Sequence, residues 1–199
     1  MNFIKYLPLI ILLLFALKFL ISYIEKSTID LNKKETEKQI KLGLLSIKDL
    51  QKNNYNTFIE IINLYLNISG FKENTILPNG NSNLTNFKTS LNNEDVFISC
   101  IQNDLVGESP DDEDNWKLTG RPDVQSFLGR LLINDCKKGI LIINSSFSDK
   151  AIEFVNDFSK KNLGIEIKLI DGYEITRSIR NHSYYITKEG LMNEVKYNI

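Results

Sequence analysis

The sequence predicts an α/β protein with a mixed sheet flanked by helices, preceded by an N-terminal transmembrane helix and a helical linker. Apolar residues recur at helical spacing over 124–132 and again over 151–158. Each of these stretches is followed by a short apolar run that is typical of a buried strand. Helix, strand, helix and strand in this order predict a right-handed parallel unit. A long apolar segment near the start of the chain predicts the membrane helix.

Residues 7–24 read LPLIILLLFALKFLISYI and contain thirteen Leu, Ile and Phe residues. Eighteen helical residues span about 27 Å, close to the ~30 Å hydrocarbon core of a bilayer. Lys18 opposes insertion by about 2.5–3.5 kcal/mol, but each of the thirteen apolar residues favours it by ~0.3–0.6 kcal/mol. Because Lys18 is close to the end of the span, its ammonium can also reach the interface. We therefore expect residues 1–24 to be a transmembrane anchor rather than a cleaved signal peptide.

Positive charge follows the apolar segment, whereas only Lys5 and the amino terminus precede it. The lysines that follow are Lys26, Lys33, Lys34, Lys38 and Lys41. This asymmetry predicts a single-pass protein of the cell membrane whose C-terminal domain is cytoplasmic. The two cysteines, Cys100 and Cys136, lack metal-ligand spacing and are expected to be reduced and structural.

Residues 25–53 are predicted to form a charged helical linker, because Ile40, Leu44 and Ile47 have helical spacing. This helix could also pair with a second copy of the chain in a short coiled coil. Asn53-Asn54 interrupts the pattern and marks the start of a domain over 54–180. Residues 181–199 form a tail without a clear pattern.

The first half of the domain predicts one helix and three strands. The helix has an apolar face that ends at Gly70, a residue suited to a helix C-terminus; that face consists of Phe58, Ile61, Ile62, Tyr65 and Leu66. The strands are expected at 71–77, 84–88 and 94–101, with turns at 78–81 and 92–93.

The second half predicts a helix over 124–132 and a buried strand over 140–143, which Gly139 introduces. Ser148 can cap the next helix. A further strand over 165–170 ends at Asp171-Gly172, and a short helix is expected over 173–179.

Three segments of this half carry a family resemblance. They are GRPDVQSFLGRLL (Gly120–Leu132), KKGILIINSSFSDKAIEF (Lys137–Phe154) and IKLIDG (Ile167–Gly172). In order and spacing they resemble the catalytic domain of Mrr-type restriction endonucleases, within the PD-(D/E)xK nuclease superfamily. The resemblance extends back to about Asn56 and implies a restriction-endonuclease-like αβββαβ core.

The resemblance also implies where the chemistry of the family would be. In such domains an Asp on one strand and a Gln on the next hold Mg²⁺, and a Lys two residues later acts on the attacking water. The corresponding positions here are Thr85, Ser99 and Ile101, with Cys100 between the last two. Hydroxyl groups are weak Mg²⁺ ligands without a carboxylate beside them, and Ile cannot act on water. We therefore expect a degenerate site that carries no cofactor.

The first hypothesis is a membrane-anchored DNA-binding or scaffold module. The net charge of −1 provides no global attraction for nucleic acid, so local basic residues must supply it. The candidates for phosphate contact are Lys88, Lys117, Arg121 and Arg130.

Two alternatives stay open. One is an active Mg²⁺-dependent endonuclease whose catalytic residues have migrated, with Glu60, Asp95 and Asp104 as candidates. The other is a membrane-tethered structural or sensory protein that oligomerises through the helix at residues 40–47. Under the first hypothesis the partner could also be another protein or a second copy of the chain. The acidic loop at 103–115 lacks the ligand pattern of a calcium loop, so we expect a solvated loop there.

Overall fold

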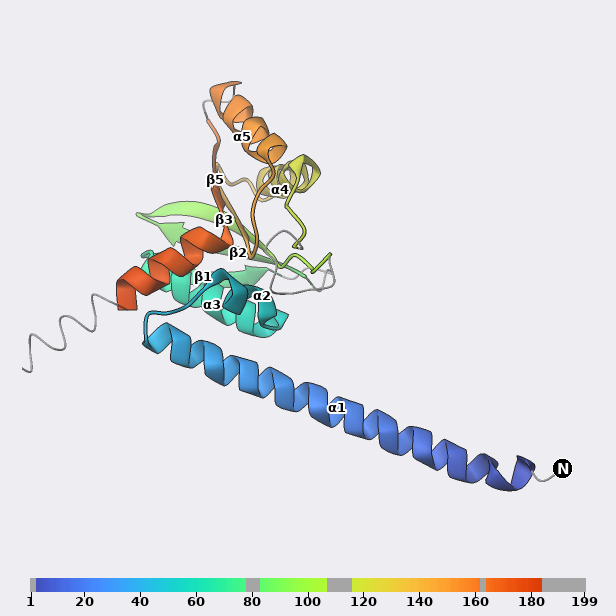
Figure 1. Cartoon of the computed structure of the whole chain (residues 1–199). Helices are drawn as coiled ribbons and strands as arrows, with labels where there is room; N and C mark the ends of the chain where they lie inside the picture. Colours follow the sequence, from blue (N-terminus) through green and yellow to red (C-terminus); the bar gives the residue numbers. More distant parts are fainter. Residues whose placement is uncertain (1–2, 78–82, 107–115, 162–163, 184–199) are drawn as a thin grey trace, which may run out of the picture.

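The computed structural model shows an α/β domain at one end of a long helix, with the amino terminus at the far end of that helix (Figure 1). It describes residues 3–77, 83–106, 116–161 and 164–183, and side chains are described from Ile10 onwards except at Glu73. The predicted turn at 78–81, most of the acidic loop and the end of the tail therefore lie outside the described residues.

The described elements follow the predicted order closely. The helices are α1 (Phe3–Lys41), α2 (Ile47–Lys52), α3 (Tyr55–Ile68), α4 (Arg121–Ile133) and α5 (Asp149–Lys161). The strands are β1 (Lys72–Leu77), β2 (Leu84–Leu91), β3 (Glu94–Ile101), β4 (Lys138–Ile143) and β5 (Glu166–Ile170). A final helical segment covers residues 172–183.

The strands form one mixed sheet in the order β1-β2-β3-β4-β5. β1, β2 and β3 are antiparallel, whereas β3, β4 and β5 are parallel, which confirms the predicted restriction-endonuclease-like arrangement. The β2–β3 turn is formed by Asn92 and Asn93, whose φ angles are 54° and 66°. Asn tolerates this left-handed region, so the predicted turn closes a two-residue hairpin.

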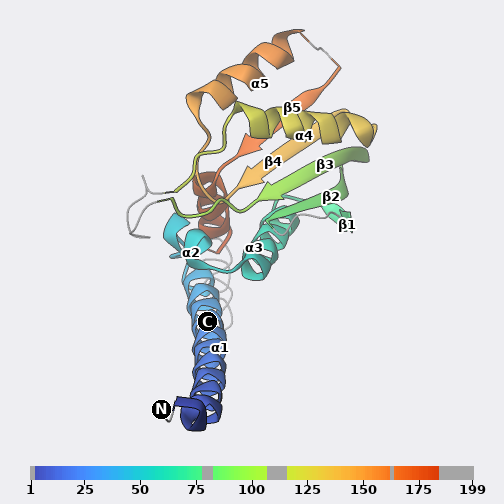
Figure 2. The same ribbon diagram turned by 90° about the vertical axis from the view of Figure 1, so that its right-hand side faces the viewer.

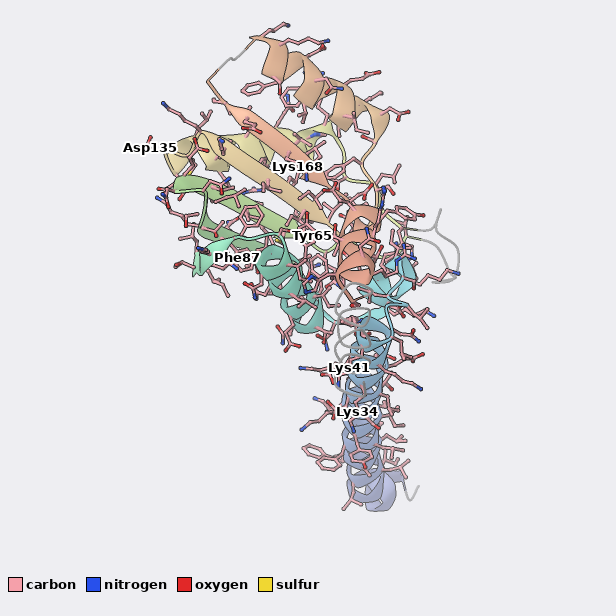
Figure 3. All side chains as sticks on the ribbon, turned by 90° about the vertical axis from the view of Figure 1, so that its left-hand side faces the viewer. Lys34, Lys41, Tyr65, Phe87, Asp135 and Lys168 are labelled. Atoms are coloured by element: carbon pink, nitrogen blue, oxygen red, sulfur yellow. The ribbon has the colours of Figure 1, made fainter. Side chains whose placement is uncertain are left out.

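Helices cover both faces of the sheet, with α3 on one side and α4 and α5 on the other (Figure 2). On β3, Ile98 and Cys100 pack in the core with α3, whereas Phe97 packs in the core with α4 and α5. Because successive side chains point to opposite faces, this strand is buried on both sides. Figure 3 labels Phe87 of β2, which belongs to the α3 core.

The predicted bounds of the linker helix, residues 25–53, are wrong. α1 ends at Lys41, and Gly43 turns the chain with a φ of 65°. Ser46 and Asp49 then form a reciprocal capping box that starts α2. Ile40 packs against the α3 core and Ile47 is buried, so the predicted apolar seam of residues 40–47 does not exist as one helix face.

The amino-terminal half of α1 projects away from the described part of the domain (Figure 1). Its large apolar side chains between Ile10 and Ile24 are exposed, whereas Thr36 near its other end is buried. Among the residues searched, which are those the structure describes, no helix is long and apolar enough to cross a membrane. The predicted transmembrane helix is therefore not confirmed.

Candidate nucleic-acid interface

The β2–β3 register separates the three predicted catalytic positions. Thr85 lies opposite Cys100, so its side chain is on the α3 face, where its hydroxyl shares a 2.5 Å hydrogen bond with the Tyr55 hydroxyl. Ser99 and Ile101 point to the α4 face. Ser99 lies opposite Asn86 and donates a 2.6 Å hydrogen bond to its side-chain oxygen. The structure therefore does not bring Thr85 together with the other two positions.

A cleft of about 280 Å³ opens where β3 ends, and we call it the strand-end cleft. The start of β2 forms one wall with Asn83 and Leu84, and α4 forms another with Ser126 and Arg130. Its charged lining residues are Asp104, Lys117, Asp123 and Arg130, and its polar amides are Asn83, Gln102 and Asn103. Ile101, which the sequence resemblance aligns with the family's catalytic lysine, also lines it. Two of the four predicted basic residues, Lys117 and Arg130, thus meet in one cleft.

Arg130 is held within this cleft by its own helix. Its Nη1 donates a 2.8 Å hydrogen bond to Ser126 Oγ one turn earlier, while its buried Nε has no hydrogen-bond partner among the described residues. Burial lowers the pKa of Arg130, and the nearby Asp123 carboxylate opposes that shift. The guanidinium nevertheless stays charged at neutral pH, because arginine starts from a pKa above about 12.

A buried network of polar side chains fixes the loops that carry Lys117. Asn103 donates from its side-chain amide to Thr119 Oγ1 at 2.8 Å and to Ser145 Oγ at 2.7 Å. Ser145 Oγ in turn donates to the carbonyl of Lys117 at 2.9 Å. Asn144 pairs with the backbone of Asn103 in both directions. The network ties β3 and β4 to both ends of the loop between residues 103 and 119.

The other two basic candidates lie elsewhere. Lys88 pairs with Asp95 at 3.2 Å, near the opposite end of β3. The Arg121 guanidinium stacks over the Phe154 ring at 5.1 Å, in a second groove of about 530 Å³ that Lys150 and Lys161 also line. The four predicted phosphate contacts therefore do not form one surface.

Comparison with known proteins places the chain in a family. Residues 50–179 match the family model of the Mrr catalytic domain, described as a restriction endonuclease. The chain belongs to this Mrr-type restriction endonuclease family. No curated protein matches the chain.

Two solved structures are similar to this Mrr-type domain. The crystal structure of the protein of unknown function AF1548 has 17% sequence identity and a TM-score of 0.42, and the match covers 62% of this chain and 65% of that one. The MspJI restriction endonuclease in complex with a 27-mer oligonucleotide has 14% identity and a TM-score of 0.34, over 61% and 26% of the two chains. The chain thus spans less than two thirds of either protein.

The side chains at the three positions that the sequence resemblance assigns to the family's site do not fit a Mg²⁺ ion. The Thr85 hydroxyl is hydrogen-bonded to Tyr55, the Ser99 hydroxyl is hydrogen-bonded to Asn86, and the Ile101 side chain has no atom that can bind a metal ion. Oxygen ligands for Mg²⁺ in such sites come mainly from carboxylates. In the described part of the chain, no group of three His, Cys, Asp or Glu side chains is arranged to hold a metal ion.

The three carboxylates proposed as migrated catalytic groups are spread over the domain. Glu60 pairs with Lys33 of α1 at 2.9 Å, and Asp95 pairs with Lys88. Asp104 accepts a 3.4 Å hydrogen bond from Asn83 at the strand-end cleft. Because Asp95 and Asp104 flank opposite ends of β3, about 20 Å of strand separates them. Sequence reasoning missed Asp123, which lines the same cleft as Asp104 but also caps α4 by accepting from Gly120 N at 3.0 Å.

Proposed function

We propose that this Mrr-type domain binds DNA phosphates at the strand-end cleft without cleaving the DNA, while α1 attaches it to a membrane. The observation that carries the proposal is the meeting of Lys117 and Arg130 in one cleft beside Ile101. In an Mrr-type nuclease this place holds the lysine that acts on the scissile phosphate. Two cations therefore remain beside a position from which the catalytic group has been lost.

The chemistry of these two residues suits phosphate. A guanidinium presents a planar set of donors that matches two phosphate oxygens, and Arg130 lines the cleft. Asp104 and Asp123 reduce the positive potential of the cleft, so binding depends on the alignment of a few contacts. We expect moderate affinity with a clear salt dependence.

Exposed apolar side chains on α1 support the membrane part of the proposal. Residues 10–24 carry Leu, Ile and Phe on all sides of the helix, and water is a poor solvent for such a surface. Insertion of residues 7–24 into a cell membrane would bury these side chains. The lysines that follow favour a cytoplasmic position for the domain.

Binding of a short fluorescent DNA duplex to the full chain in detergent micelles tests the cleft. We expect Lys117→Gln and Arg130→Gln each to weaken binding at every sequence and to reduce the slope of log K against log salt by about 1 between ~50 and ~200 mM salt. Lys88→Gln is the matched control, because it removes the same charge at the other end of β3. Equal losses in all three variants, or no loss in any, would contradict a phosphate site at this cleft.

A second candidate function is an active metal-dependent nuclease. It is favoured by one observation, namely that two carboxylates, Asp104 and Asp123, line the same cleft as Lys117. Incubation of the full chain with plasmid DNA and Mg²⁺ or Mn²⁺, against EDTA, tests it. Metal-dependent nicking that Asp104→Asn abolishes would replace the proposal of binding without cleavage.

A further inference from the structure

Two hydrogen bonds in series, the first buried and the second partly buried, connect α1 to the strand-end cleft. Thr36 is the one α1 residue with a buried side chain among those described, with 4% of its surface exposed. Its hydroxyl accepts a 2.7 Å hydrogen bond from the side-chain amide of Asn53. The backbone carbonyl of Asn53 accepts a 2.8 Å hydrogen bond from the side-chain amide of Gln102, which lines the cleft. Two side chains therefore separate α1 from the proposed binding site.

Gln102 is held from both sides. Its backbone N–H donates to the carbonyl of Asn83 at 3.2 Å, so it also joins β3 to the opposite wall of the cleft. The next residue, Asn103, belongs to the buried network that positions Lys117. A displacement of Asn53 would therefore act on Gln102 and, through it, on groups that line the cleft.

Two further contacts that the structure describes for α1 lie away from the cleft. Lys33 pairs with Glu60 on the surface of α3, and the Ile40 carbonyl accepts a 3.0 Å hydrogen bond from Ser183 Oγ. These contacts hold α1 against the domain at other points. α1 is a single helix of 39 residues, so a change in the orientation of its apolar half is transmitted to Thr36 without an intervening joint.

We infer that α1 regulates the strand-end cleft through the hydrogen-bond chain Thr36–Asn53–Gln102. When α1 is docked, Asn53 holds Gln102 and the cleft is ordered. When α1 is displaced, the Asn53 amide keeps only its bond to the carbonyl of Asp49, and the hold on Gln102 loosens. The orientation that a membrane imposes on α1 thus sets how well the cleft binds its ligand. This inference rests on the proposed function for the ligand, a DNA phosphate, but the coupling itself requires no ligand.

Hydrogen exchange of the full chain in detergent micelles, without DNA, tests the coupling. Thr36→Val keeps the shape of the side chain and removes the hydroxyl acceptor. We expect amides over 101–105 to exchange about tenfold faster, because one buried hydrogen bond is lost. Thr36→Ser, which restores the hydroxyl, should restore slow exchange. Lys33→Gln removes a different α1 contact and should leave residues 101–105 unchanged.

A second variant tests the coupling in the opposite direction, from the cleft to α1. Gln102→Met removes the amide that binds Asn53 and should speed exchange over 50–54 and around Thr36, because coupling between two sites is reciprocal. Unchanged exchange at 101–105 in Thr36→Val would overturn the inference, as would an equal effect of Lys33→Gln or a uniform acceleration that includes β4. Loss of DNA binding in neither Lys117→Gln nor Arg130→Gln would refute the proposed ligand and leave the exchange result standing.

Discussion

Asn86 of β2 and Ser99 of β3 lie opposite each other on adjacent strands, and their side chains share a 2.6 Å hydrogen bond on the face of the sheet that α4 covers. Both side chains are buried, and Ile101 is the next residue of β3 on the same face. The residue of β2 that lies opposite Ser99 is thus Asn86 and not Thr85. A neutral hydrogen-bonded pair thus occupies this part of the α4 face.

Replacing Ser99 with Ala should destabilise the domain by about 1–3 kcal/mol, because the Asn86 oxygen would remain buried without its donor. Urea unfolding followed by circular dichroism gives the change. Ser159→Ala on the exposed surface of α5 is the control and should stay within ~0.5 kcal/mol. A Ser99→Ala domain as stable as the control would mean that the pair adds nothing.

The register also predicts which substitutions can rebuild a metal site. In the variant N86D/S99E the two carboxylates share one face, so they repel each other until a cation binds between them. We expect Mn²⁺ to raise the melting temperature of this variant. In T85D/S99E the carboxylates lie on opposite faces, and Mn²⁺ should have no such effect. A similar Mn²⁺ response in both variants would show that the assignment of faces is incorrect.

Local sequence patterns were sufficient to predict most of the fold. The bounds of β3 and the Asn92-Asn93 turn agree with the prediction, because alternation and turn chemistry act over a few residues. The prediction of one continuous linker helix was wrong at Gly43. Ile40, Leu44 and Ile47 keep helical spacing in the sequence, but Gly43 between them has a positive φ and ends the helix.

The site was less predictable, because its contacts are not local. Asn103 and Asn144 are 41 residues apart, and nothing near either one reveals the partner. Lys117 and Arg130 were both candidates, but only the packing of α4 beside β3 shows that they share a cleft. The sequence did contain a signal for the face on which Thr85 lies. Phe87 is two residues later on the same strand, so its side chain shares that face, and it packs in the core on the α3 side.

Gly139 at the start of β4 should not tolerate a larger residue. A Cβ added there would lie 2.8 Å from Phe127 Cζ and 2.9 Å from Leu131 Cδ2, so these two buried side chains of α4 would have to shift. We expect Gly139→Ala to cost about 1–3 kcal/mol of unfolding free energy. Gly129→Ala, where a Cβ meets nothing within 4 Å, should stabilise α4 by up to ~1 kcal/mol. Thermal unfolding of both variants measures the contrast, and equal changes would contradict it.

Membrane attachment through α1 can be measured by flotation of the full chain with lipid vesicles. Leu13 and Phe19 are exposed, with 58% and 78% of their surface accessible, so a charge at either position should not disturb the domain. We expect L13E/F19E to lose most of the vesicle-bound fraction, because each Glu opposes burial in hydrocarbon. Leu118→Glu adds a charge at a similarly exposed position of the domain and should float like the parent chain. Retained flotation of L13E/F19E would argue against α1 as the attachment site.

The last prediction concerns the pH dependence of stability. Burial raises the pKa of the Cys100 thiol well above its ordinary value, so the thiol stays protonated in the folded chain at mildly alkaline pH. In the unfolded chain the thiol ionises above about pH 8.5. The stability due to the neutral buried thiol is therefore fully present below pH ~8.5 and declines as the pH rises towards the folded pKa, by up to ~1.4 kcal/mol per pH unit.

Urea unfolding between pH 8 and 9.5, where tyrosines still contribute little, measures this slope. Cys100→Ala should lower stability at every pH through lost packing, but it should flatten the decline because the thiol at this position can no longer ionise on unfolding. Cys136→Ala is the companion variant. Burial also raises the pKa of Cys136, but the charge of nearby Lys88 opposes the shift, so its removal should flatten the slope less. An unchanged slope in Cys100→Ala would mean that this thiol does not control the alkaline limit.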